Sequence, residues 1–247
     1  MSGLTQQGEA NLSSTSPTLV TASQIHAANR VYGRLPGWRL IDRTLQRLCD
    51  AVPGFDEEGC MLKSVVINSL YSTQVWAIVR MARHVATLGI EHWTAGEVVL
   101  VERIAAMPGA DRRFHSFAAK FCHFFIDCER YPIYDEAARE TLQLHLGSLY
   151  RTSDEHPYQT FVENFSLFRN RIGVEFKSRD IDRYLWITGM YLRWQRQRET
   201  GHSMQVSREL QELLENPTRV AADLDEMLPA SVVRTFQIPG KPAGKVP

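Results

Sequence analysis

Helical spacing of apolar residues runs through nearly the whole chain and restricts its fold more than any other feature. Leu40, Ile41, Leu45 and Leu48 recur three or four residues apart within residues 39–52. This spacing places side chains on one face of a helix. Signals for strands are poor throughout. The chain is therefore predicted to be mainly α, with helices over 39–52, 57–72, 73–88, 94–107, 112–127, 136–149, 158–176, 180–196 and 207–215.

The two ends of the chain differ in composition from the part between them. The first eighteen residues, MSGLTQQGEANLSSTSPT, are mostly small and polar, and the last ten, IPGKPAGKVP, are rich in proline and glycine. Such segments cannot bury enough apolar surface to offset the entropy of ordering. We therefore expect disordered tails over 1–23 and 233–247, flanking a single helical domain over 24–232.

Charge and cysteine spacing argue against several classes of protein. The 28 basic residues balance the 28 acidic ones, so any surface that binds phosphates must be local. The four cysteines match no zinc or iron–sulfur spacing, and we expect reduced thiols, no metal and no cofactor. Neither a membrane-spanning run nor a secretory signal is visible. The expectation is a cytoplasmic protein, working as a monomer without a membrane partner.

The strongest signs of chemistry lie between residues 116 and 136. The predicted 112–127 helix carries a stripe of phenylalanines and a second, polar stripe that includes Lys120. Apolar neighbours lower the pKa of an amine because burial disfavours its charged form. A neutral amine can attack C1′ of a deoxyribose and form a Schiff base. The alternative is a lysine whose stem lies along the core while its amine reaches solvent.

Two residues near Lys120 are further candidates. Asp135 immediately precedes the predicted 136–149 helix and can cap its N-terminus. A carboxylate held there can also stabilise positive charge on a sugar, and the two roles are compatible. His123 lies one helical turn after Lys120, where it would contact a base or a phosphate, or fill the core as a hydrogen-bonded histidine.

Two segments are candidates for contact with DNA. Arg112 and Arg113 follow the Pro108-Gly109 turn at the expected start of a helix, a position that favours phosphates; the alternative is a pair of solvated arginines. The polar residues from 68 to 73 favour a turn. Tyr71, if exposed on this turn, could insert into a base stack; the alternative is a buried tyrosine at a helix junction.

Aromatic residues offer a way to hold a base that has left the duplex. A flipped base is bound by stacking between aromatic or apolar side chains. Aromatic residues at helical spacing also fill ordinary cores, so the pattern alone does not separate the two uses. The candidates for stacking are Trp76, Tyr134, Trp186 and Trp194.

These residues resemble a known family, the helix-hairpin-helix DNA glycosylases, and in particular the branch of 8-oxoguanine-glycosylase-like and archaeal enzymes. The resemblance covers about residues 55–200. Residues 65–85 are similar to that family's early helix pair, whose turn fills the gap left by a flipped base, and residues 180–186 are similar to a late helix that closes the pocket. The most specific block is K-x-x-H-F…P-I-x-D, formed by Lys120, His123, Phe124, Pro132, Ile133 and Asp135.

The hairpin signature of that family, L-P-G-[VI]-G-x-K-T-A, is altered. Residues 107–113 resemble its beginning, but Asp111 stands at the second glycine and Arg113 at the lysine. An arginine cannot form a Schiff base. If Lys120 is the equivalent lysine, only 15 residues separate it from Asp135, which is shorter than the family's usual spacing. A monofunctional enzyme would need only the aspartate and a water molecule, so lyase activity stays open.

The resemblance implies a DNA glycosylase that flips a modified base out of double-stranded DNA and excises it, leaving an abasic site. A narrower likeness is to bacterial anti-phage glycosylases that remove glucosylated hydroxymethylcytosine. The alternatives are a repair glycosylase for oxidised purines, a non-catalytic DNA-binding module, and a helical interaction protein without a nucleic-acid partner. On the first reading Asp135 and Lys120 are catalytic, the base pocket contains His123, Tyr134 and Trp186, and the DNA-binding residues are Asn68, Tyr71, Arg112 and Arg113.

Overall fold

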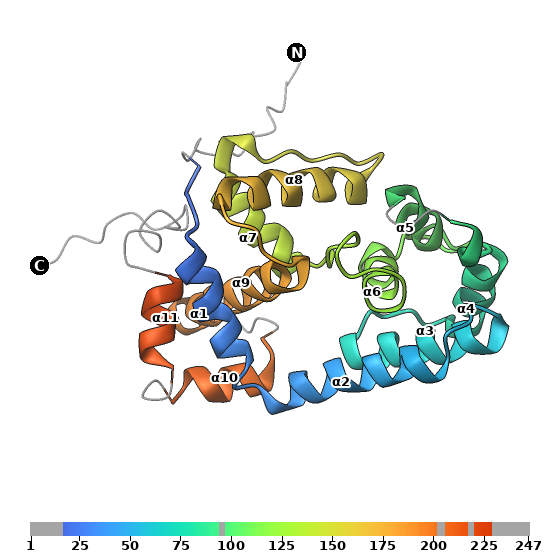
Figure 1. The fold of residues 1–247 in the computed structure, drawn as a ribbon, viewed down its shortest axis with the longest axis horizontal. Helices are drawn as coiled ribbons and strands as arrows, with labels where there is room; N and C mark the ends of the chain where they lie inside the picture. The colour runs from blue at the N-terminus through green and yellow to red at the C-terminus, as the bar shows by residue number, and fades with distance from the viewer. Residues whose placement is uncertain (1–16, 94–96, 202–205, 217–219, 229–247) are drawn as a thin grey trace, which may run out of the picture.

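The computed structural model describes residues 17–93, 97–201, 206–216 and 220–228. Every regular element in these ranges is a helix (Figure 1), which confirms the mainly α prediction. The α-helices are α1 (Ala22–Tyr32), α2 (Pro36–Ala51), α3 (Glu57–Tyr71), α4 (Ile78–Thr87), α5 (Val98–Ala105), α6 (His115–Phe125), α7 (Glu136–Leu146), α8 (Pro157–Ile172), α9 (Ser178–Thr200), α10 (Arg208–Leu214) and α11 (Ala221–Met227), and the short 3-10 helices are η1 (Ile90–His92) and η2 (Gly147–Leu149).

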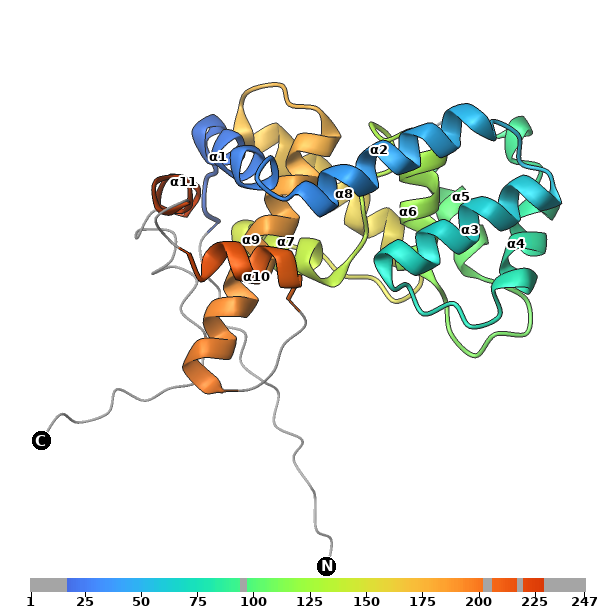
Figure 2. The ribbon, with the colours of Figure 1, turned by 90° about the horizontal axis from the view of Figure 1, so that it is seen from below.

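The helices gather at two ends of an elongated molecule. One group contains α1, α7, α9, α10 and α11, and the other contains α3, α4, α5 and α6, as the two perpendicular views show (Figures 1 and 2). Helix α1 packs on α9 and α11, while α3 packs on α4 and α6. Helix α2 runs between the groups and contacts α3 and α6, and α8 contacts both α5 and α7. Residues from both groups can therefore line one site.

The interface between α7 and α9 depends on a glycine. A Cβ atom at Gly189 would lie 2.7 Å from the carbonyl oxygen of Ala137. Nearby, the Thr141 hydroxyl donates to the Leu185 carbonyl oxygen across the same interface at 3.0 Å. The absence of a side chain at Gly189 thus lets the two backbones approach closely and fixes how α9 lies on α7.

The connection from α3 to α4 departs from the predicted helix over 73–88, because α4 begins at Ile78. The side chain of Asn68 explains the delay: its oxygen accepts from the Val75 amide and the Thr73 hydroxyl, each at 2.9 Å. These bonds compete with helical backbone bonds. Ser72 and Gln74 consequently adopt positive φ angles of 48° and 58°, which are unusual for residues other than glycine.

The N-terminal boundary also differs from the prediction. Helix α1 begins at Ala22, inside the expected tail, and Val20 is buried. The side-chain oxygen of Gln24 accepts from the Thr21 amide at 2.8 Å, as in a capping box, and its amide group donates to the Met227 carbonyl at 3.0 Å. The domain therefore includes residues 17–23. The rest of the expected tails, 1–16 and 233–247, lies outside the described residues, as do the starting residues 94–96 of the predicted 94–107 helix.

Helices α5 and α6 pack side by side around a tight turn that contains Gly109, whose φ is +70°. The Ala110 amide donates to the Met107 carbonyl across the turn at 3.3 Å, and the Phe114 amide donates to the Ala105 carbonyl at 2.9 Å. Only glycine adopts this φ without steric cost. The residues around Pro108-Gly109 thus form a tight connection between two packed helices.

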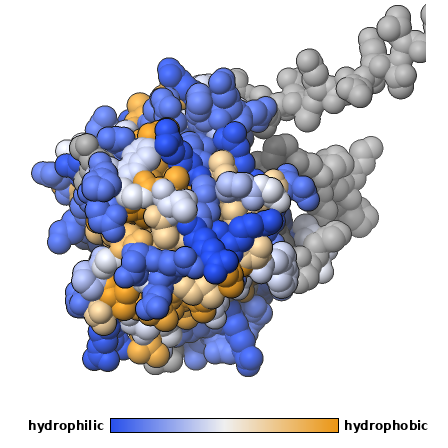
Figure 3. All heavy atoms as spheres, turned by 90° about the vertical axis from the view of Figure 1, so that its right-hand side faces the viewer, coloured by the Kyte–Doolittle hydropathy of each residue, from blue (hydrophilic) through white to orange (hydrophobic). Residues whose placement is uncertain are grey.

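None of the helices in the described ranges combines the length and the apolar character needed to cross a membrane. The surface at the α4 and α5 end alternates hydrophilic and apolar groups (Figure 3). Single exposed apolar side chains of this kind are normal on protein surfaces. Those on α3, α4 and α5 are Leu62, Val65, Val79 and Val99.

Candidate functional site

A small pocket of about 40 Å³ lies where the two groups of helices meet. Its walls come from α1, α2, α3, α7, α9 and the segment just before α7, so the site depends on the whole fold. Four aromatic rings and four charged side chains face it. Its lining residues are Tyr32, Trp38, Tyr71, Ile133, Asp135, Ala138, Arg179, Asp182, Arg183 and Trp186.

Aromatic rings form one side of this pocket. The rings of Trp38 and Trp186 are 4.6 Å apart, and Trp38 also packs against Tyr71 with centroids 5.7 Å apart. Tyr32 meets Trp186 edge-on at 6.3 Å. Flat aromatic surfaces of this kind stack planar ligands, and nucleobases are stacked in this way by many proteins.

Asp135 caps α7, as the sequence predicts. Its Oδ1 accepts from the Ala138 amide at 2.8 Å, and Asp135 lines the pocket. The hydrogen bond fixes the carboxylate, and the positive end of the α7 dipole stabilises its negative charge. Asp135 is thus a positioned anion at the pocket wall.

A second carboxyl group, Asp182 on α9, lies deeper and is only 4% exposed. Its Oδ1 accepts from the Ile133 amide at 3.1 Å. Burial raises the pKa of Asp182 to about 7, although Arg179 and the Ile133 amide act in the opposite direction and Asp135 adds to the rise. Near neutral pH this carboxyl therefore exists in both protonation states.

Arg179 is held in place from two sides. Its guanidinium forms an ion pair with Asp42 of α2, and it donates to Nε2 of His123 at 3.4 Å. Asp42 also accepts from Tyr32 at 2.9 Å and from Arg183 at 3.2 Å. The network links α1, α2, α6 and α9 and presents fixed positive charge to the pocket.

His123 supports the pocket from behind and is not among the residues that line it; it is buried and hydrogen-bonded, as in the alternative of a core histidine. Its Nδ1 lies 2.8 Å from the Tyr131 carbonyl oxygen, and a carbonyl only accepts, so Nδ1 carries the proton. Nε2 is then free to accept from Arg179. Burial, followed by the charge of Arg179, holds the pKa of His123 well below its usual value. A neutral His123 therefore positions Arg179.

Lys120 is buried next to the pocket but does not line it. Its Nζ donates to the Ser116 hydroxyl at 2.7 Å and lies 5.7 Å from the centre of the Tyr71 ring. Burial lowers the pKa of Lys120, against the opposing charges of Asp135 and Asp182. The charges of the amine and of both carboxyl groups therefore influence one another. The Tyr71 side chain lies between the amine and the pocket.

Of the two other predicted pocket residues, Trp186 and Tyr134, only one lines the pocket. Trp186 lines the pocket as predicted. Tyr134 does not, because its ring packs between α6 and α8, with centroids 5.8 Å from His115 and 5.1 Å from Phe161. Tyr134 directly precedes Asp135, and side chains of consecutive extended residues point in opposite directions. Tyr134 thus stabilises the fold on the far side of this segment.

The predicted wedge residues also have other positions. Tyr71 points inward and lines the pocket, with its hydroxyl buried, so the alternative of a tyrosine at a helix junction holds. Asn68 organises the turn by the hydrogen bonds described above. The exposed aromatic residue of this turn is Trp76, whose exposure is 90%.

Arg112 and Arg113 are exposed beside this turn. Arg112 donates to the Gln74 carbonyl at 2.7 Å and so braces the residues with positive φ. Arg113 lies 3.6 Å from Glu102, which also accepts from His115 at 2.7 Å. Both arginines therefore have protein partners, and Arg112 connects the hairpin to the turn that carries Trp76.

Sequence reasoning missed Asp42, Arg179, Asp182 and Arg183. On α9, Arg179, Asp182, Arg183 and Trp186 are spaced i, i+3, i+4 and i+7, which places them on one face of the helix. Charged residues on the same face as a tryptophan, in a helix otherwise rich in apolar residues, are a detectable signal. Which other helices face them is not visible in local spacing. Among the described residues no group of three or more His, Cys, Asp or Glu side chains is arranged to hold a metal ion.

Comparison with protein families gives one partial match. Residues 24–129, less than half of the chain, match the family model HI_0787_N, described as an N-terminal domain. The matched part runs from α1 to the end of α6 and includes Trp38, Tyr71 and Lys120, but not Asp135 or Asp182. Comparisons with curated proteins and with solved structures give no match.

Proposed function

We propose that the protein is a DNA N-glycosylase, which binds a flipped base in the aromatic-walled pocket and cleaves its bond to the sugar. The observation that carries this proposal is the position of Asp135: its carboxylate is fixed by the Ala138 amide at the wall of a pocket lined by Trp38 and Trp186. Breaking an N-glycosidic bond leaves positive charge on the sugar. A preorganised anion in a site with little water stabilises that charge most effectively.

The reaction needs only a water molecule and the residues of this chain. As the bond between C1′ and the base nitrogen breaks, both electrons leave with the base, and Asp135 stabilises the oxocarbenium-like sugar. Water adds its hydroxyl to C1′, and its remaining proton neutralises the departing base. The products are the free base and an abasic site.

Lys120 is assigned a supporting role. Its amine lies behind Tyr71 and is held by Ser116, so a Schiff base with the sugar would require Tyr71 to move. We propose that the enzyme is monofunctional and that Lys120 supplies charge behind the two carboxyl groups. Borohydride treatment during turnover should then trap no covalent adduct between DNA and the protein.

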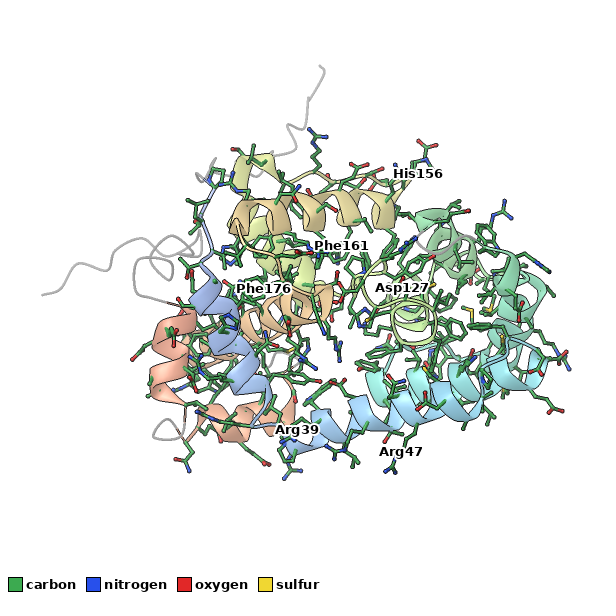
Figure 4. All side chains as sticks on the ribbon, in the orientation of Figure 1. Arg39, Arg47, Asp127, His156, Phe161 and Phe176 are labelled. Carbon is green, nitrogen blue, oxygen red and sulfur yellow. The ribbon has the colours of Figure 1, made fainter. Side chains whose placement is uncertain are left out.

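DNA binding is supported by a row of positive charge on α2 and by an exposed aromatic ring on the turn after α3. The exposed side chains of Arg39, Arg43 and Arg47 are spaced four residues apart along α2, and Figure 4 shows Arg39 and Arg47 along its outer edge. Successive turns of a helix present such residues in a row, which suits contact with successive phosphates. Trp76, on the braced turn after Tyr71, is suited to fill the gap left by a flipped base.

The substrate proposed from the sequence is a modified cytosine of phage DNA, excised in anti-phage defence. The pocket volume of about 40 Å³ is small. A glucose attached to the base would therefore have to project through the mouth of the pocket. An oxidised purine in a repair reaction is the second candidate, favoured by the same small volume.

The test uses four DNAs: phage DNA with glucosylated hydroxymethylcytosine, phage DNA with hydroxymethylcytosine alone, a duplex oligonucleotide that carries oxidised purines, and unmodified plasmid. After incubation with the protein, alkali converts every abasic site into a strand break. We expect breaks in at least one modified DNA and none in the plasmid. Binding without breaks in any DNA, including one that carries oxidised purines, would instead indicate a non-catalytic DNA-binding module.

A further inference from the structure

Three buried side-chain atoms of pocket-lining residues have no hydrogen-bond partner among the described residues, and one of them is a carboxyl oxygen; the atoms are Oη of Tyr71, Nε of Arg183 and Oδ2 of Asp182. Oδ2 of Asp182 is inaccessible to solvent and makes no hydrogen bond, while Oδ1 of the same carboxyl accepts from the Ile133 amide at 3.1 Å. An unsatisfied buried carboxyl oxygen is costly. Because Asp182 lines the pocket, a ligand there can supply the missing donor.

Two donors next to Asp182, on His123 and Arg179, are engaged elsewhere. Nδ1 of His123, 3.6 Å from Oδ2, donates to the Tyr131 carbonyl. Arg179 donates to Asp42 and to His123. These bonds direct the donors of His123 and Arg179 to other acceptors, so neither satisfies Oδ2. Trp186, one helical turn further along α9, provides a flat surface on the same face.

We propose that Oδ2 of Asp182 accepts a hydrogen bond from the amino group of a bound nucleobase and so selects amino-bearing bases. This inference rests on the proposed function, since it takes the pocket to be the place that receives a base. A carboxylate that accepts from an exocyclic amino group is an established way to distinguish one base edge from another. The substrate class is then derivatives of the bases that carry an exocyclic amino group, which are cytosine, adenine and guanine, and it excludes thymine and uracil derivatives.

The protonation state of Asp182 adds a dependence on pH. The titratable and charged groups around it are Arg179 on the same helix, His123 and Lys120 on α6, and Glu129 and Asp135 in the segment between α6 and α7. Burial raises the pKa of Asp182 to about 7. The ionised acceptor therefore predominates at pH 8, and the protonated form, which donates instead, predominates at pH 5.5.

The test measures binding of free bases in pairs that differ only in the amino group: cytosine against 2-pyrimidinone, and adenine against purine. Binding is followed by the indole NMR signals of the native protein at pH 8. A hydrogen bond to a charged group should make the amino-bearing base of each pair bind at least about tenfold more tightly. At pH 5.5 this preference should fall.

Asp182→Asn sharpens the test. The variant retains an oxygen for the Ile133 amide and presents an NH₂ group in place of Oδ2, so the preference should reverse toward the base without the amino group. Asp180→Asn, on the same helix but outside the pocket lining, is the matched control and should keep the native preference. Unchanged unfolding temperatures would show that both variants fold.

Equal affinity within both pairs for the native protein would overturn the inference, as would an unchanged preference in Asp182→Asn. Failure of every base to bind would also overturn it. None of these results depends on catalysis. Strand breaks in modified DNA together with equal affinities would leave the glycosylase proposal standing and remove only the role of Asp182.

Discussion

The two halves of α9 use charge in opposite ways. In its C-terminal half, Arg193 lies 2.9 Å from Glu136 and 3.1 Å from Glu140, and Gly189 brings the backbone directly onto α7. In its N-terminal half, Asp182 is buried with one oxygen unsatisfied. The same helix thus pairs the charge of Arg193 with two carboxylates at one interface and leaves an oxygen of Asp182 without a hydrogen bond at the other.

The difference indicates where the fold gives up stability. Buried polar groups normally have hydrogen-bond partners, and exceptions need an explanation. At the α7 interface every feature described favours a fixed packing. At the pocket, a buried acid with a raised pKa lies beside a positioned anion, as is common at sites that act on a ligand. The C-terminal half should therefore respond to substitution through stability, and the pocket through function.

The largest expected effect is on the pocket side. Asp135→Asn keeps an N-cap for α7, because asparagine caps helices as well as aspartate does, but it removes the negative charge. We expect base release to fall about 100-fold or more, with a change in unfolding temperature of only a few degrees. Both are measured on purified protein.

Asp56→Asn is the matched control for this substitution. Asp56 caps α3 by accepting from the Gly59 amide at 2.7 Å and lies outside the pocket lining. It should show the same small change in unfolding temperature and full activity. Full activity in Asp135→Asn would remove Asp135 from the mechanism.

Gly189→Ala tests the packing of α9 on α7. The new Cβ would approach the oxygen, Cα and Cβ of Ala137 at 2.7–2.9 Å, so the helices must separate. We expect the free energy of unfolding to fall by about 3 kcal/mol, measured by urea denaturation. Gly54→Ala, where nothing lies within 4 Å of the new Cβ, should change it by less than about 0.5 kcal/mol. Equal effects would disprove the close approach of α7 and α9.

The stability contributed by Asp182 should depend on pH. Because burial raises its pKa to about 7, the folded state holds the proton more tightly than the unfolded state does. This contribution is complete below the unfolded pKa of 3.8 and is lost as the pH rises through 7. The Asp182→Asn variant has no carboxyl group at this position and cannot lose stability in this way. The difference between its free energy of unfolding and that of the native protein should therefore rise by roughly 2 kcal/mol from pH 5 to pH 8.

Burial also lowers the pKa of His145 to about 3, which makes stability fall as the pH drops below 6.5. His145 is present in both the native protein and Asp182→Asn, so its effect cancels when their free energies of unfolding are subtracted. Urea unfolding of the two proteins across this range gives the comparison. A difference that is constant with pH would show that Asp182 does not titrate as a buried acid.

The smallest effect concerns the turn next to the pocket. Trp76→Ala should reduce base release from duplex DNA several-fold, roughly 1 kcal/mol, because the gap left by the flipped base is no longer filled. Single-stranded DNA has no such gap, so Trp76→Ala and the native protein should release the base from it at equal rates. Val79→Ala, at an exposed apolar residue of the next helix, is the control. Equal losses on both kinds of DNA would exclude the wedge.

The sequence predicted the helices and the capping role of Asp135 because both depend on neighbours in the chain. It did not predict α1, whose capping bonds involve Gln24 and whose contacts come from α11, or the late start of α4, which depends on the side chain of Asn68. The sequence left two positions open for His123, in the pocket or in the core, for a related reason: periodicity gives a residue's direction on its own helix, but not which helix faces it. The role of Asp182 depends on contacts with Ile133 and His123, which lie far from it in the sequence. Local spacing could not reveal these contacts.

Mass spectrometry of the small molecules released from modified DNA by the native protein tests the central claim most directly. If Asp135 acts on the sugar of a base held against the aromatic wall formed by Trp38 and Trp186, the product is a free modified base and the DNA strand stays intact until alkali is added. Release of nucleotides or nucleosides, or of no small molecule from any modified DNA, would contradict the account.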